Sequence, residues 1–264
     1  MNRIVVLLFA VITLSSCNSK FQKILKSKDT DLKIQMAETY FKMKKYSHSQ
    51  QLFESVINFV KGTPRYEELY LMYANSYFLD KDYDNAENIF KTFIEYFPNS
   101  AKREEVEYLR AYTYYLRSPK PELDQTLTNR CMQLMQAFID AHPGTQRSKD
   151  ALEVLDVCRT KLEKKDEKTA KLYYDLAMYR AAAISYGLMS DGYPDSKNSD
   201  QYKLLTIKAY YDFAKNSFVD KQKERFEKVV AEYNDFVDRY SDSPLLAEAK
   251  KIKEKTDDTL KTLK

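Results

Sequence analysis

A cysteine closes the first apolar run of this chain, and its surroundings predict a covalent modification. Residues 4–14 are apolar except for Thr13, and Arg3 and the amino terminus place positive charge before them. A basic start followed by a short apolar stretch is typical of a secretory signal. The run is shorter than the roughly 20 apolar residues that a membrane-spanning helix needs. We therefore expect export of the chain and processing at Cys17.

The residues around Cys17 end the signal in an unusual way. An ordinary signal ends in an A-x-A-like site, whereas this one ends Leu14-Ser15-Ser16-Cys17, which resembles the bacterial lipobox. The resemblance implies cleavage before Cys17, acylation of its sulfur and its new amino group, and a lipid-anchored mature chain. Residue 18 is Asn, whereas an Asp at this position commonly retains lipoproteins at the inner membrane, so the outer membrane is favoured. The acidic run that sends some lipoproteins to the cell exterior is also missing after Cys17, which favours the periplasmic face. The alternative is a buried cysteine ending a core helix, but this run lacks the polar positions of such a helix.

No other residues are spaced for catalysis. The two histidines, His48 and His142, lie far apart in the sequence, and the H-E-x-x-H, G-x-S-x-G and C-x-x-C motifs are absent. Acidic pairs are plentiful, but on solvated helices they usually support contacts between residues four apart. We expect no enzymatic activity, no metal and no cofactor beyond the covalent lipid on Cys17.

Two cysteines remain in the mature chain, Cys131 and Cys158. An exported protein could oxidise them to a disulfide. Both lie in stretches that are typical of half-buried helices, NRCMQLM and LDVCRTK. Two inert thiols are favoured, and a disulfide stays open as the alternative.

The composition predicts an all-α protein. Four glycines among 264 residues are too few for a sheet-rich fold or a phosphate-binding loop, both of which need turns with positive φ. The seven prolines lie where helices would begin or end, as in Thr63-Pro64 and Ser243-Pro244.

The net charge of +4 is concentrated towards the two ends of the chain. Residues 20–45 hold eight Lys and three acidic residues, and residues 250–264 hold six Lys and three acidic residues. A basic stem suits an anionic membrane surface, although a charge run can also be only a solvated helix face. A nucleic-acid reader would need a basic face in its folded part, so no nucleic acid is expected.

A degenerate helix pair recurs along nearly all of residues 30–243. The first helix carries a small residue and, three positions later, a tyrosine: Ala37/Tyr40, Ala74/Tyr77, Ala111/Tyr114 and Ala170/Tyr173. The second helix carries small and large residues four apart, namely Ser49/Phe53, Ala86/Phe90, Cys131/Met135 and Ala182/Tyr186, and three copies close with Pro98, Pro143 and Pro194. Ala209 and Phe226 mark a fifth copy. The pattern resembles the tetratricopeptide repeat.

Such helix pairs cannot bury their apolar faces alone and stack on their neighbours. The resemblance implies a right-handed superhelical solenoid of about five tetratricopeptide-type helix pairs plus a C-terminal capping helix. Residues 148–186 contain neither Gly nor Pro, so we expect one rigid helix there between two halves. The predicted domains are a signal peptide (1–16), a lipidated tether (17–29), N-terminal repeats (30–146), C-terminal repeats with the long helix (147–243), and the capping helix with a basic tail (244–264).

The stretch VLDVCRTKLEKKDEKTAKLYYDLAMYRAAAISYGLMSDGYPDS, residues 154–196, together with the lipobox and the repeats, resembles the BamD family of lipoproteins. That family serves the outer-membrane β-barrel assembly machine. The resemblance implies that the N-terminal repeats receive unfolded outer-membrane proteins. It also implies that the C-terminal repeats hold the periplasmic domains of the barrel subunit BamA, beside other assembly lipoproteins. The tyrosine content, the short third-repeat insertion and Ser185, where some members carry arginine, depart from the family.

Two sets of candidate residues follow. First-helix positions beside the core positions face the concave side of such repeats and form the candidate substrate-peptide groove: Leu71, Asn75, Phe78, Tyr108 and Tyr112. Apolar area with hydroxyl and amide groups suits outer-membrane strands, which alternate apolar and polar residues and carry aromatic girdles. The alternative is that these rings only pack between helices. The resemblance implies the interface with the barrel subunit, assigned to Tyr174, Arg180, Tyr186 and Tyr202.

Two other functions stay open. One is a periplasmic tetratricopeptide adaptor lipoprotein in cell-wall synthesis or envelope integrity. The other is a sugar-binding outer-membrane lipoprotein with helical repeats, a class that is usually much longer. Co-purification with an outer-membrane barrel would distinguish the β-barrel assembly function from both of these alternatives.

Overall fold

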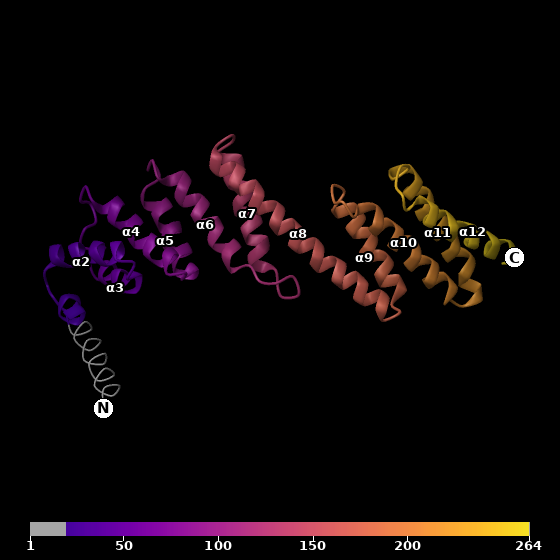
Figure 1. The fold of residues 1–264 in the computed structure, drawn as a ribbon, viewed down its shortest axis with the longest axis horizontal. Helices are drawn as coiled ribbons and strands as arrows, with labels where there is room; N and C mark the ends of the chain where they lie inside the picture. Colours follow the sequence, from indigo (N-terminus) through magenta and orange to yellow (C-terminus); the bar gives the residue numbers. More distant parts are fainter. Residues whose placement is uncertain (1–19, 264) are drawn as a thin grey trace, which may run out of the picture. The chain divides into compact units, whose positions relative to one another are not determined.

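The structure is a computed structural model that describes residues 20–263, so the predicted lipobox lies outside the described residues. Within this part every regular element is an α-helix, which confirms the all-α prediction. A short helical segment covers residues 20–25. The helices that follow are α2 (Thr30–Lys42), α3 (Tyr46–Val56), α4 (Tyr66–Leu79), α5 (Tyr83–Tyr96), α6 (Arg103–Arg117), α7 (Thr126–Ala141), α8 (Gln146–Asp175), α9 (Tyr179–Gly192), α10 (Ser199–Lys215), α11 (Val219–Arg239) and α12 (Leu246–Thr262) (Figure 1).

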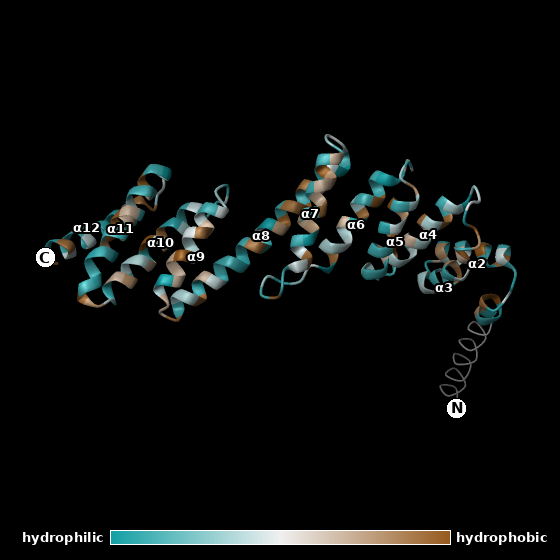
Figure 2. Cartoon of the chain, turned by 180° about the vertical axis from the view of Figure 1, so that it is seen from behind, coloured by the Kyte–Doolittle hydropathy of each residue, from teal (hydrophilic) through white to brown (hydrophobic). Residues whose placement is uncertain are grey.

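Helices that follow one another in the sequence pack side by side, as in α2 with α3 and α10 with α11. They are banded teal and brown in Figure 2, as amphipathic helices are. The predicted small positions are almost fully buried, with exposed fractions of 0% for Ala37, Ala74 and Ala182 and 1% for Ala111. Small side chains let the helix axes approach closely, which is why the repeat keeps them.

The helices form two compact units, here called unit 1 (Met1–Pro119 and Asp124–Cys158) and unit 2 (Lys120–Leu123 and Arg159–Lys264). The division falls inside α8, whereas the sequence placed the domain boundary at 146/147. The reason is that the two parts of α8 serve different cores. Ala151 and Leu155 pack with α6 and α7 in unit 1, and Ala170 packs with α9 and α10 in unit 2.

Serines fix three of the junctions between helix pairs. Each follows the closing turn of one pair and donates a hydrogen bond to a carboxylate on the previous first helix: Ser100 to Glu67, Ser196 to Glu163 and Ser243 to Asp200. Each serine Oγ also accepts the backbone N–H two residues later. The P-N-S, P-D-S and S-D-S turns of the sequence therefore both end one pair and attach the next.

Three helix pairs turn through a residue with positive φ that is not glycine: Lys44, Lys81 and Ala177, at 58°, 66° and 56°. In each turn the next N–H donates to the carbonyl of the repeat tyrosine, as in a Schellman helix end: Lys45 to Tyr40, Asp82 to Tyr77 and Met178 to Tyr173. Because no glycine marks the third turn, the sequence predicted one helix over 148–186. That prediction holds as far as Asp175, where α8 ends, and is wrong beyond it.

Two candidate binding surfaces

The residues predicted to form the substrate groove lie on two first helices of unit 1. Leu71, Asn75 and Phe78 lie on α4, and Tyr108 and Tyr112 lie on α6. We call these five residues the tyrosine face. Helices α4 and α6 both pack against α5, and the bond from Ser100 to Glu67 ties the start of α6 to the first turn of α4.

The tyrosines of α6 form a row of stacked rings. The Tyr108 and Tyr112 ring centroids lie 5.6 Å apart with an interplanar angle of 15°. Tyr112 lies 5.2 Å from Tyr115 at 28°. Tyr108 is buried, and its burial raises the pKa of its hydroxyl to about 12. Tyr112 is half-buried, so its ring is partly available to a ligand.

An arginine closes one end of this row. The Arg147 guanidinium lies 4.6 Å from the centre of the Tyr108 ring. It also donates to both carboxylate oxygens of Glu105, at 2.7 Å and 2.6 Å. A guanidinium held in a bidentate pair and over a ring is strongly fixed in orientation. Sequence reasoning missed Arg147 and Glu105, because they lie on different helices and no local spacing links them.

Of the three residues that α4 contributes to the tyrosine face, two pack inside unit 1 and one is partly exposed. The Phe78 ring lies 5.6 Å from Tyr83 and 6.0 Å from Phe90, so it fills the space between α4 and α5. Leu71 packs against the core of unit 1. The Asn75 side chain is half-buried and forms no hydrogen bond with any described residue. Its amide is therefore a polar group of this face that is open to a partner.

Of the four residues predicted to contact the barrel subunit, two lie in the interior of unit 2 and two lie at its surface. Tyr186 and Tyr202 are buried, with exposed fractions of 4% and 1%, and both belong to the core of α8, α9 and α10. The Tyr202 hydroxyl donates to Glu163 at 2.7 Å. The structure therefore places these two tyrosines where they pack the helices of the repeats against one another.

Tyr174 and Arg180 lie at the surface of unit 2. Tyr174 is half-buried and donates to Asp212 on α10. Arg180 is exposed and forms no ion pair with any described residue. Ile184 and Leu188 follow it at helical spacing on α9, with exposed fractions of 45% and 68%. Arg180, Ile184 and Leu188 are here called the α9 stripe.

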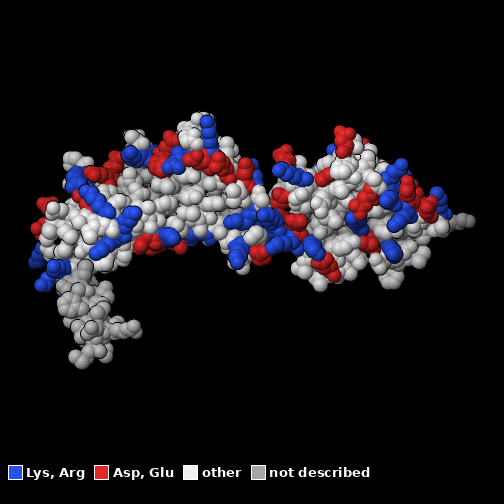
Figure 3. All heavy atoms as spheres, viewed as in Figure 1, with Lys and Arg blue, Asp and Glu red and all other residues white. Residues whose placement is uncertain are grey.

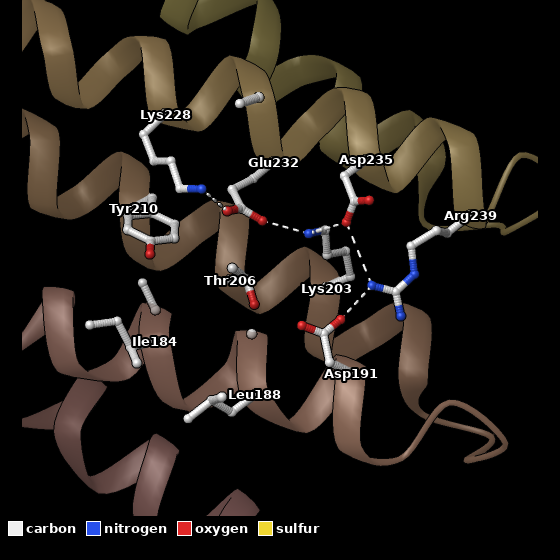
Figure 4. A pocket seen from close by; sticks show the side chains of 13 residues that line it. Ile184, Leu188, Asp191, Lys203, Thr206, Tyr210, Lys228, Glu232, Asp235 and Arg239 are labelled. Atoms are coloured by element: carbon white, nitrogen blue, oxygen red, sulfur yellow. Dashed lines mark hydrogen bonds and ion pairs between the residues drawn. The ribbon is translucent and has the colours of Figure 1, made fainter.

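A pocket of about 450 Å³ opens beside this stripe, between α9, α10 and α11 (Figure 4). Ile184 and Leu188 line its α9 wall. A chain of ion pairs runs along α10 and α11 through Lys228, Glu232, Lys203, Asp235 and Arg239, and it ends at Asp191 on α9. The pocket therefore offers an apolar wall opposite a charged one.

Lys203 is the centre of this chain, and its side chain is only 7% exposed. Burial alone would lower the pKa of Lys203, but its hydrogen bonds to Asp235 and Glu232 outweigh burial and raise it. Burial would likewise raise the pKa of Asp235, but the contact with Lys203 outweighs it and lowers that pKa. The sequence places four of these residues on one face of one helix by their spacing: Lys228, Glu232, Asp235 and Arg239. It does not show that Lys203, which lies on α10, contacts them.

Three further properties of the described residues bear on function. No group of His, Cys, Asp and Glu among them could hold a metal ion. Cys131 and Cys158 are both buried thiols in unit 1. Across residues 20–263 no helix has the length and apolar character to cross a bilayer.

Stacked helix pairs with buried small residues at recurring positions define a helical-repeat protein of the tetratricopeptide type. The model of the YfiO outer membrane lipoprotein family matches residues 27–224, so the chain belongs to that family. This confirms, at the level of the family, the resemblance to BamD lipoproteins seen in the sequence. No curated protein sequence matches the chain.

Proposed function

We propose that this protein is a lipid-anchored scaffold of the β-barrel assembly complex, on the periplasmic face of the outer membrane. The observation that carries the proposal is the match to the outer membrane lipoprotein family, which extends into both units. Repeat scaffolds of this kind work by binding other proteins. The test is co-purification of the native protein with an outer-membrane barrel subunit of the BamA type. Recovery with cell-wall synthesis proteins instead would favour the adaptor function.

The anchor of this proposal is an acylated Cys17. The lipobox supports it, and family membership agrees with it. Mass spectrometry of the native amino terminus should find Cys17 with two or three acyl chains. Cys17→Ala should release the protein from the outer membrane or mislocalise it, and should leave its helical circular dichroism unchanged. An unlipidated chain that begins at another residue would contradict the anchor.

The tyrosine face is the proposed receptor for unfolded outer-membrane proteins. The half-buried ring of Tyr112 offers apolar area, and the Asn75 amide offers hydrogen bonds to a strand backbone. Such a surface suits alternating apolar and polar strands without demanding one sequence. Tyr112→Ala should weaken capture of a peptide that copies the last strand of a barrel protein by about 1–3 kcal/mol, as expected for a central aromatic anchor.

The matched control for this experiment is Phe59→Ala. Phe59 also lies in unit 1 and is 77% exposed, but it follows α3, outside the tyrosine face. We expect it to leave peptide capture unchanged. Photo-crosslinks from Asn75 and Tyr112 should reach the peptide. Crosslinks that form only from positions in unit 2 would contradict the assignment.

The proposed contact with the barrel subunit uses Tyr174 and the α9 stripe. An exposed arginine beside two exposed aliphatic side chains has the composition of an interface centre. Arg180→Ala combined with Leu188→Ala should weaken recovery of the barrel subunit and leave peptide capture intact. Tyr112→Ala should give the opposite result. Loss of both activities in either variant would show that the two surfaces are not separate.

A further inference from the structure

Two lysine-rich segments that are separated in the sequence lie side by side in unit 1. The Phe21 ring packs 5.8 Å from Tyr40 and 4.2 Å from His48, measured between ring centroids. Phe21 is 2% exposed and belongs to the core of unit 1. The helical segment 20–25 is therefore held against the turn that joins α2 to α3.

This packing gathers six lysines, here called the basic patch: Lys20, Lys23, Lys26, Lys42, Lys44 and Lys45. All six are exposed, and neither residues 20–26 nor residues 42–45 contain an acidic side chain. In Figure 3 the end of unit 1 that holds these segments shows mainly blue and white, with little red.

The lysines of the basic patch differ from many other lysines of the protein in having no ion-pair partner. Lys168, Lys203 and Lys208 each have a carboxylate within 4.0 Å. None of the six patch lysines has one among the described residues. Lys45 lies 6.0 Å from the Tyr40 ring, which adds no negative charge. The positive charge of the patch is therefore not neutralised within the described part of the chain.

An apolar side chain stands in the middle of this charge. Met43 lies between Lys42 and Lys44 at the α2–α3 turn and is 56% exposed. Exposed apolar groups flanked by lysines are the combination that enters the headgroup layer of a bilayer, where the methionine meets acyl chains and the ammonium groups meet phosphates. A protein partner would instead need several carboxylates and would gain little apolar contact here.

We propose that the basic patch and Met43 form a binding surface for the headgroups of anionic phospholipids. The inference rests on the proposed function, since an acylated Cys17 would lie only three residues before Lys20. Acyl chains hold the end of the chain at the membrane but leave the facing side of the protein free. The basic patch restrains the orientation of the protein, because its binding to headgroups turns the α2–α3 turn towards the bilayer.

The test uses the mature chain, residues 17–264 with Cys17→Ala, made without the apolar run of residues 4–14, so that neither acyl chains nor the signal contributes to binding. Flotation with vesicles of phosphatidylcholine plus phosphatidylglycerol should recover the protein, and vesicles of phosphatidylcholine alone should not. Each lysine near an anionic surface contributes up to about 1 kcal/mol, or about fivefold in affinity. Changing the six patch lysines to Gln should therefore lower binding at least about tenfold, and changing them to Arg should keep it. Salt at about 1 M, where the Debye length is about 3 Å, should abolish it.

The matched control changes six other exposed lysines that form no ion pair among the described residues: Lys197, Lys215, Lys223, Lys250, Lys251 and Lys255. It removes the same net charge, and we expect binding to persist. Equal losses in the two variants would overturn the proposal, because net charge alone would then explain binding. Circular dichroism of each variant establishes that the fold is retained.

Two further outcomes separate this inference from the proposed function. No binding of the Cys17→Ala chain to anionic vesicles overturns the patch, while the mass of the native amino terminus still decides the anchor. If the six Gln changes leave vesicle binding intact and remove a co-purifying acidic protein, the patch binds protein and the bilayer assignment is wrong.

Discussion

The two units join the same kind of helix pair by different physics. In unit 1 the contacts between helices are rich in aromatic rings, and Tyr66 and Tyr70 on α4 both lie within 6.4 Å of Tyr96 on α5, measured between ring centroids. In unit 2 the tyrosines instead donate to carboxylates on neighbouring helices: Tyr174 to Asp212, Tyr193 to Asp166 and Tyr202 to Glu163.

The tyrosine pKa values show the same contrast. Burial raises the pKa of Tyr70 and of Tyr108 to about 12 in unit 1. In unit 2, burial raises the pKa of Tyr174 and Tyr202, and the nearby carboxylates raise it further because a phenolate beside a carboxylate is unfavourable. One repeat pattern thus accepts two ways of joining helices. Unit 2 should depend on charge where unit 1 depends on ring packing.

The largest expected effect is the loss of the buried cation of unit 2. Lys203→Met should lower the free energy of unfolding by about 3–5 kcal/mol, because Glu232 and Asp235 lose the charge that compensates them. Lys228→Met is the matched control, since Lys228 is 51% exposed and pairs with the same Glu232. It should cost about 1 kcal/mol or less. Urea denaturation measures both, and equal losses would contradict a special role for burial.

A second test compares equivalent carboxylates in the two units. Glu163 accepts hydrogen bonds from Ser196 and Tyr202, whereas Glu67 accepts one from Ser100. Glu163→Ala should destabilise the protein by about 2–3 kcal/mol, because it leaves the buried Tyr202 hydroxyl without an acceptor. Glu67→Ala should cost about 1 kcal/mol. A larger loss from Glu67→Ala would reverse the comparison.

Removing single hydroxyl groups should give a smaller difference. The Tyr174 hydroxyl donates to Asp212, and the Tyr112 hydroxyl forms no hydrogen bond with a described residue. Tyr174→Phe should cost about 1–2 kcal/mol and Tyr112→Phe less than about 0.5 kcal/mol in unfolding free energy. If both changes lower the unfolding free energy equally, the tyrosine–carboxylate hydrogen bonds of unit 2 do not add to its stability.

The smallest expected effect is a dependence of stability on acid pH. Contact with Lys203 outweighs burial and lowers the pKa of Asp235 below the ordinary aspartate value of 3.8. Its stabilisation is therefore fully present above that value and is lost as the pH falls through the folded-state pKa. The effect is modest because the Asp235 side chain is 46% exposed and screened by solvent. Thermal melting between pH 7 and pH 2 should show it in the native chain and less of it in Asp235→Asn. A pH profile unchanged by Asp235→Asn would contradict it, and Asp31→Asn in unit 1 is the control.

Sequence reasoning succeeded where a feature depends on local pattern. The buried small positions and the large residues that follow them, such as Ala86 and Phe90, were predicted from spacing alone and are fully buried. It failed at the end of α8, because Ala177 adopts positive φ without the glycine that usually marks such a turn. The resemblance also assigned Tyr186 and Tyr202 to the interface with the barrel subunit, whereas the structure buries both in the core of unit 2. A tyrosine carries apolar area and a hydroxyl, so its residue type alone does not distinguish the two environments.

The sequence by itself determined the family, the all-α class and the register of the helix pairs. These follow from residues three and four apart on one helix, whose contacts are set by helix geometry. Only the tertiary structure decided which side chains meet across helices. It placed Arg147 over Tyr108, enclosed Lys203 between two carboxylates and brought Phe21 against Tyr40. Such contacts depend on the rotation of each helix about its axis and on the turns between helices. Interhelical packing fixes both, and no local spacing of residue types encodes them.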